Sequence, residues 1–113
     1  MNHELTYCHL HTVPDGPPQN ILGHGVDGMP LQVGLSWQPP LPELRNGDIV
    51  QYHIMCRGVT TTTAELSIRV SVPTPATRYT CSVAAATAVG PGVSGSVDVL
   101  SGRLGCCLYT CKL

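Results

Sequence analysis

Phenylalanine is absent from this 113-residue chain, and charged residues make up only 12% of it, about half the usual share. Its 6 basic and 7 acidic residues leave a net charge of −1, which removes the electrostatic basis for a nucleic-acid binder or a membrane-surface protein. No apolar run approaches the roughly 18 to 20 residues needed to span a bilayer. The first residues, MNHELTY, lack a basic cluster and an apolar run, so we expect no signal peptide there. Two possibilities remain: an intracellular protein, or a piece of a larger secreted or membrane protein.

Motifs that carry catalysis or phosphate binding are also missing. No serine lies in a G-x-S-x-G setting. The glycines Gly23, Gly25 and Gly28 match G-x-G-x-x-G, but they lie between two strand candidates and not before a helix, so we assign residues 23–28 to a loop. We therefore expect no enzyme activity, no catalytic residue and no cofactor.

Turn-forming residues and short alternating segments are plentiful. The chain has 12 glycines, 10 prolines and a hydrophobic content of 42%, which suits one packed domain of short strands. Alternation of apolar and polar residues predicts strands within 19–22, 31–37, 48–56, 60–63, 65–72, 78–86 and 93–100. We expect an all-β, immunoglobulin-like sandwich of about seven antiparallel strands. The residues expected to form its core are Leu35, Trp37, Tyr52, Ile54, Leu66, Ile68, Tyr79, Val83 and Val97.

Five segments fall in the order found in fibronectin type III domains. They are Pro17-Pro18, Leu35 to Pro40 (LSWQPP), Asn46 to Tyr52 (NGDIVQY), Pro75 with Tyr79, and Val83 to Ala85 before Gly90 and Gly92. Over about residues 14–101 the chain resembles this family, most of all the domains of roundabout-type guidance receptors. The resemblance implies that Trp37 ends strand B, that Tyr52 lies on strand C, and that the Tyr79 hydroxyl bonds a backbone group a few residues upstream. Because Pro73 replaces the family's usual leucine, Val72 is expected to fill the core there.

Two of the six cysteines, Cys56 and Cys81, fall on inward faces of the predicted body. If the usual family register holds, Tyr79 lies directly across from Cys56, and Cys81 is a diagonal neighbour about 7–8 Å away. That separation is too long for a disulfide without distortion. We therefore expect Cys56 and Cys81 to be buried free thiols that act as small hydrophobes.

The two ends of the chain match nothing in the family, and we expect residues 1–13 and 102–113 to be disordered tails. They hold the remaining soft ligands, His3, Cys8, His9 and His11 at one end and Cys106, Cys107 and Cys111 at the other. These types suit Zn²⁺ or Cu(I). The ends of a sandwich of this kind lie about 30 Å apart, however, so disordered tails are favoured over a metal site.

The resemblance implies a non-catalytic module of a cell-surface adhesion or guidance receptor. Such a module would space neighbouring domains or bind a protein partner, and its address would be extracellular. Two alternatives stay open: an intracellular structural module of the same family, and a small metal- or redox-active protein that uses the terminal Cys/His clusters. No Arg-Gly-Asp tripeptide and no N-x-[ST] sequon is present, and the sequence does not identify the ligand.

Overall fold

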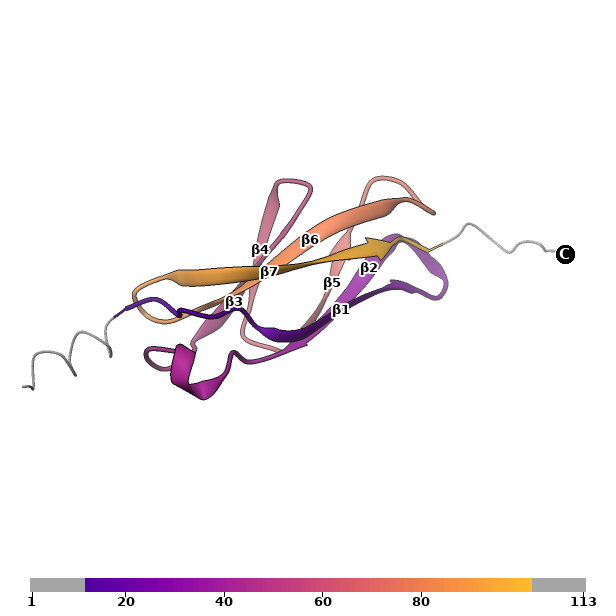
Figure 1. Cartoon of the computed structure of the whole chain (residues 1–113). Helices are drawn as coiled ribbons and strands as arrows, with labels where there is room; N and C mark the ends of the chain where they lie inside the picture. Colours follow the sequence, from indigo (N-terminus) through magenta and orange to yellow (C-terminus); the bar gives the residue numbers. More distant parts are fainter. Residues whose placement is uncertain (1–11, 103–113) are drawn as a thin grey trace, which may run out of the picture.

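Seven strands form two antiparallel sheets that face each other (Figure 1). The structure is a computed structural model that describes residues 12–102. The first sheet has the order β1-β2-β5 and consists of β1 (Gln19–Val26), β2 (Met29–Gln38) and β5 (Ser67–Ser71). The second has the order β4-β3-β6-β7 and consists of β4 (Val59–Thr63), β3 (Gln51–Cys56), β6 (Arg78–Ala86) and β7 (Pro91–Leu100). A single 3-10 turn, η1 (Pro42–Leu44), links the sheets. The predicted all-β sandwich is confirmed.

The core lies between the sheets because alternate side chains of each strand point inward. On β6 this alternation buries Tyr79, Cys81 and Val83 and leaves Arg78 and Thr80 exposed. The buried cluster consists of Val33, Leu35, Trp37, Tyr52, Ile54, Cys56, Val70, Val72, Tyr79, Cys81, Val83, Ala85 and Val99. Ile68 and Val97 are partly buried and pack against it.

Leu66 is the one expected core residue that lies at the surface, with 39% of its area exposed. Its carbonyl accepts a hydrogen bond from the Trp37 N–H at 3.0 Å, so its backbone lies beside the end of β2. Its side chain, however, comes just before β5 begins, at the end of the sandwich and not between the sheets. The buried positions of this segment are Val70 and, next to Pro73, Val72.

The glycine-rich segment that was predicted as a loop continues β1, and that prediction is wrong. Strand β1 runs through Gly23 and Gly25 to Val26, and only Asp27 and Gly28 turn the chain into β2. The glycines are needed because β7 passes close by. A Cβ atom on Gly23 would lie 2.7 Å from the Cβ of Val99, a separation that real Cβ atoms essentially never show. Glycine here permits a close approach of two strands.

The chain enters and leaves the sandwich at opposite ends of its long axis (Figure 1). At one end the Asn46 side-chain amide donates to the Val13 carbonyl at 3.0 Å, and the Thr87 hydroxyl donates to the Thr12 carbonyl at 2.9 Å. At the other end the Ala76 N–H donates to the Gly102 carbonyl at 2.8 Å. Contacts with the sandwich therefore extend beyond residues 14–101, into segments that were assigned to the tails.

Candidate interaction surface

The residues expected to form the structural core meet at the centre of the sandwich. Leu35, Ile54 and Val83 are buried, and Trp37 is only 2% exposed. The Trp37 and Tyr52 rings pack at a centroid distance of 5.4 Å with an interplanar angle of 59°, a tilted geometry that aromatic pairs favour. Burial raises the pKa of the Tyr52 phenol above its usual value of 10.0, and the Arg45 guanidinium partly opposes this shift. These side chains support the fold and are not accessible to a partner.

Tyr79 holds the corner that precedes β6. Its hydroxyl accepts a hydrogen bond from the Thr74 N–H at 3.1 Å and donates to the Thr74 carbonyl at 3.2 Å. The contact spans five residues, and the Thr74 hydroxyl joins it. The Arg57 guanidinium lies 5.8 Å from the centroid of the same ring. Tyr79 thus makes the upstream backbone contact that the resemblance implied.

Cys56 and Cys81 form a disulfide, so the prediction of two free thiols is wrong. The structure pairs Cys56 directly with Cys81 at a Cα separation of 4.3 Å. Tyr79 is not opposite Cys56, because it lies beyond the end of β3. The predicted register differs from the observed one by two residues. Such a shift keeps every inward side chain inward, so apolar alternation could not have exposed the error.

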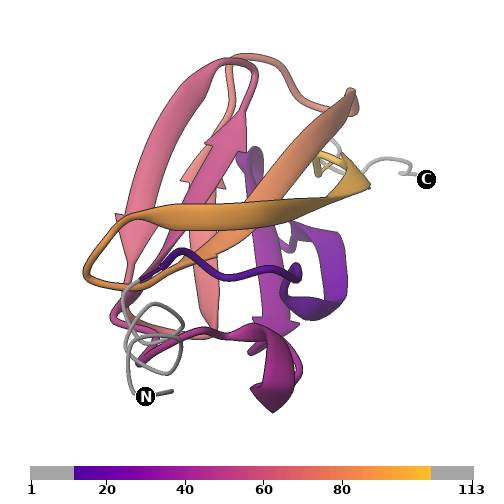
Figure 2. The ribbon, with the colours of Figure 1, turned by 60° about the vertical axis from the view of Figure 1, so that its left-hand side comes forward.

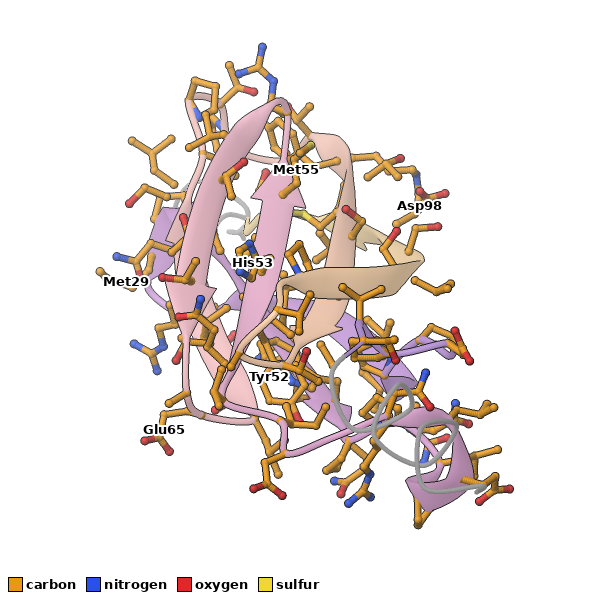
Figure 3. The ribbon with its side chains drawn as sticks, turned by 90° about the vertical axis from the view of Figure 1, so that its left-hand side faces the viewer. Met29, Tyr52, His53, Met55, Glu65 and Asp98 are labelled. Carbon is orange, nitrogen blue, oxygen red and sulfur yellow. A yellow bond between two sulfur atoms is a disulfide. The ribbon has the colours of Figure 1, made fainter. Side chains whose placement is uncertain are left out.

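The outer face of the four-stranded sheet is accessible and has few charges (Figure 3). Two ladder rows cross it. One row contains Thr62, His53, Ala84 and Ser94, and the other contains Thr60, Met55, Ser82 and Ser96. Neither row holds Asp, Glu, Lys or Arg. Met55 projects from β3 one residue before the strand ends and is 48% exposed. Burial of this face against a protein would require little charge desolvation.

The surroundings of this face do not form a chemical centre. On the same face, the next outward pair of β6 and β7 is Thr80 and Asp98, and the Asp98 carboxylate accepts a hydrogen bond from the Thr80 hydroxyl at 2.7 Å. Within residues 12–102 no group of three or more His, Cys, Asp or Glu residues could hold a metal ion. The predicted terminal ligands, His3 to His11 and Cys106 to Cys111, lie outside the described residues. Among the residues that the structure describes, no helix is long and apolar enough to cross a membrane.

Sequence reasoning missed three polar residues that fasten the ends of the module. Ser101 is buried, and its hydroxyl donates to the carbonyl groups of Thr74 and Thr77 at 2.9 and 3.2 Å. Asn46 and Thr87 bind the incoming chain at the opposite end. Asn46 has a φ of 58°, a conformation that asparagine tolerates better than most residues. The Asn46-Gly47 pair indicated a turn, but no local pattern in the sequence predicts the hydrogen bonds of Asn46 and Thr87 to carbonyls far away in the chain.

Comparison with known proteins gives relatives in sequence and in structure, although no family model matches the chain. Roundabout homolog 1 of Mus musculus is 32% identical over 92 residues, or 74% of this chain. Roundabout homolog 3 of Homo sapiens is 46% identical over 46 residues, or 40% of this chain. The chain spans only 6% of the length of the first relative and 3% of the second. It corresponds to one segment of much longer proteins.

Two solved structures share the fold. The crystal structure of FN3tt superposes with a TM-score of 0.66 at 21% identity and covers 81% of this chain and 98% of that one. The chicken CNTN1 FN1-FN3 domains superpose with a TM-score of 0.68 at 17% identity and cover 81% of this chain and 35% of that one. At these identities the similarity concerns the arrangement of the strands.

Proposed function

Because this chain is a fibronectin type III domain with a roundabout-like sequence, we propose that it is a non-catalytic spacer and protein-binding module in the extracellular part of a cell-surface receptor. The observation that carries the proposal is the position of the two ends. Contacts at Thr12 and Val13 hold the incoming chain at one end of the sandwich, and contacts at Ser101 and Gly102 hold the outgoing chain at the other. Neighbouring domains would therefore be held in line.

The span of such a spacer follows from strand geometry. β7 contains 10 residues, and strands rise about 3.3 Å per residue, so the module would separate its neighbours by about 30 Å. The docked ends favour a defined separation over a flexible one, because each end is bound to the sandwich by backbone or side-chain hydrogen bonds. The sparsely charged outer face of the β4-β3-β6-β7 sheet remains available to a protein partner beside this in-line arrangement.

The Cys56–Cys81 disulfide supports an extracellular address. Disulfides persist in secreted and cell-surface proteins and are rare in the reducing cytosol. The proposal therefore favours a receptor module over an intracellular structural module of the same family.

Small-angle X-ray scattering tests the spacing. Two folded reporter domains would be joined directly in one protein and through this chain in another. We expect the distance between the reporter centres to increase by about 30 Å when the chain is inserted. Reporters that lie side by side after insertion would rule out the in-line spacer.

Peptide mapping without reduction tests the proposed extracellular location. Protein passed through the secretory route of a eukaryotic cell should contain the Cys56–Cys81 bridge, and protein retained in the cytosol should not. Secreted material that is folded but has both thiols free would contradict the extracellular assignment. A Cys56→Ala/Cys81→Ala variant made in parallel provides the unbridged reference.

A further inference from the structure

β4 is an open edge of its sheet (Figure 3), since within residues 12–102 its single strand neighbour is β3. Arg57 and Gly58, which connect the two strands, both have positive φ values, 53° and 79°. These values define a two-residue type I′ hairpin, in which the residues on either side of the turn form a hydrogen-bonded pair. That pair is Cys56 and Val59. The turn therefore determines which backbone groups of β4 face its free side.

Backbone groups of a strand point alternately to its two sides. Starting from Val59, the N–H and C=O groups of Thr61 and Thr63 also point to β3, whereas those of Thr60 and Thr62 point away from it. Among residues 12–102, no backbone hydrogen bond beyond the sheet ladders involves Thr60 or Thr62. Two residues thus present unpaired donors and acceptors in an extended conformation.

The other sheet edges of the module are protected. β1 and β7 pack against each other, and the segment before β1 runs along β7, where the Val93 N–H donates to the Pro14 carbonyl at 3.3 Å (Figure 2). The edge strand β5 carries the exposed charge of Arg69 at its centre. β4, with the sequence VTTTT, has no charge, proline or bulge, which are the usual devices that keep an edge from pairing.

We propose that β4 is a self-association site, at which a second copy of this chain pairs antiparallel with the first about Thr61. In this register Thr60 of each copy lies opposite Thr62 of the other, and each of these pairs exchanges both of its N–H···O bonds. The two four-stranded sheets become one continuous sheet. The inference goes beyond the spacer role and does not depend on it.

Charge complementarity selects the second copy and this register. Arg57 and Glu65 are the charged residues nearest to Thr61, four positions before and four after it. Within one copy they lie beyond opposite ends of β4, Arg57 in the turn before it and Glu65 after it. In the antiparallel pair the turn end of each copy lies beside the Thr63 end of the other, which brings Arg57 of each copy near Glu65 of the other. Both side chains are exposed, and within the described part of the chain neither makes an ion pair. The Arg57 guanidinium lies over the Tyr79 ring, from which its long, exposed side chain can turn.

Sedimentation velocity over a concentration series of the full chain tests the proposal. We expect a weak monomer–dimer equilibrium, because a pairing of two strands buries a small area. Thr62→Pro removes an outward N–H, a change that an edge strand tolerates, and should lower the association constant at least about tenfold. Thr62→Val keeps the backbone donor and serves as the matched control, with association unchanged.

A charge-reversal cycle tests the register. Arg57→Glu or Glu65→Arg alone should weaken association, and the double variant should restore it. The contact between Arg57 and Tyr79 is lost both in Arg57→Glu and in the double variant. Recovery of association in the double variant would therefore be due to the ion pair between the two copies. A chain that stays monomeric at every concentration overturns the proposal. Association that persists unchanged in Thr62→Pro places the contact elsewhere and overturns it too, as does a double variant that fails to recover.

Discussion

Removal of the Cys56–Cys81 bridge should lower the free energy of unfolding by about 3.5 kcal/mol. The bridge joins residues separated by 25 positions, and the loop-entropy relation gives this value for a loop of that size at 25 °C. The two sulfur atoms lie in the core, with Cys81 fully buried and Cys56 3% exposed, so reduction leaves their packing largely in place. The loss therefore reflects mainly the larger freedom of the unfolded chain. It is a substantial part of the 5–15 kcal/mol typical of a domain.

Urea unfolding followed by tryptophan fluorescence measures this loss. Trp37 is the single tryptophan of the chain and packs on Tyr52 in the core, so its emission reports the sandwich. The protein would be unfolded with and without a thiol reductant. In the Cys56→Ala/Cys81→Ala variant the reductant should have no effect, because the remaining four cysteines lie outside the bridge. This variant controls for other effects of the reductant.

Two results would contradict a stabilising role of the bridge. A change below about 1 kcal/mol on reduction would mean that the bridge constrains the unfolded chain far less than its loop length implies. An equal effect of the reductant on the Cys56→Ala/Cys81→Ala variant would mean that the stabilisation comes from other thiols.

Four further changes test individual contacts. Trp37→Ala empties the centre of the core and should cost about 3–5 kcal/mol in urea unfolding; a cost below about 1 kcal/mol would show that Trp37 is peripheral. Tyr79→Phe keeps the ring but leaves the Thr74 N–H without its acceptor and removes one of the two donors to the Thr74 carbonyl, so we expect a loss of about 1–3 kcal/mol, and a neutral result would contradict the corner geometry. Ser101→Ala leaves the Thr77 N–H without its acceptor and removes the hydroxyl donor shared by the Thr74 and Thr77 carbonyls, so it should lower the thermal midpoint, whereas an unchanged midpoint would show that the last residues are not held. Because burial raises the pKa of Tyr52, the phenol of the unfolded chain loses its proton at a lower pH than that of the folded chain. The stability that the phenol contributes is therefore fully present below pH 10.0, the usual pKa of the group, and is lost as pH rises through the folded pKa. The fall in unfolding free energy above that pH should therefore be smaller in Tyr52→Phe, and an identical pH profile would contradict the shift.

The strands with clear alternation were predictable because period-two patterning depends on local backbone geometry. The segments around Trp37, Tyr52 and Tyr79 could be assigned to strands with the correct inward face, and their order carried the resemblance to fibronectin type III domains that the comparisons confirm. The outer-face residues follow from the same alternation. Alternation does not identify which residue of the neighbouring strand lies opposite a given residue.

The features that depend on such neighbours could be assigned only from the packing of the strands in space. Gly23 and Gly25 were assigned to a loop because glycine is common in turns, yet both lie in β1, and at Gly23 the Val99 side chain of β7 leaves no room for a Cβ atom. The alternation of apolar and polar residues was enough to predict that Cys56 and Cys81 point into the core. Which residue faces Cys56 depended on the pairing of β3 with β6, and two registers that differ by two residues bury the same faces. The amino-acid pattern fits both registers equally well. The packing of the whole sandwich selects the one that places Cys81 opposite Cys56, and the disulfide forms for that reason.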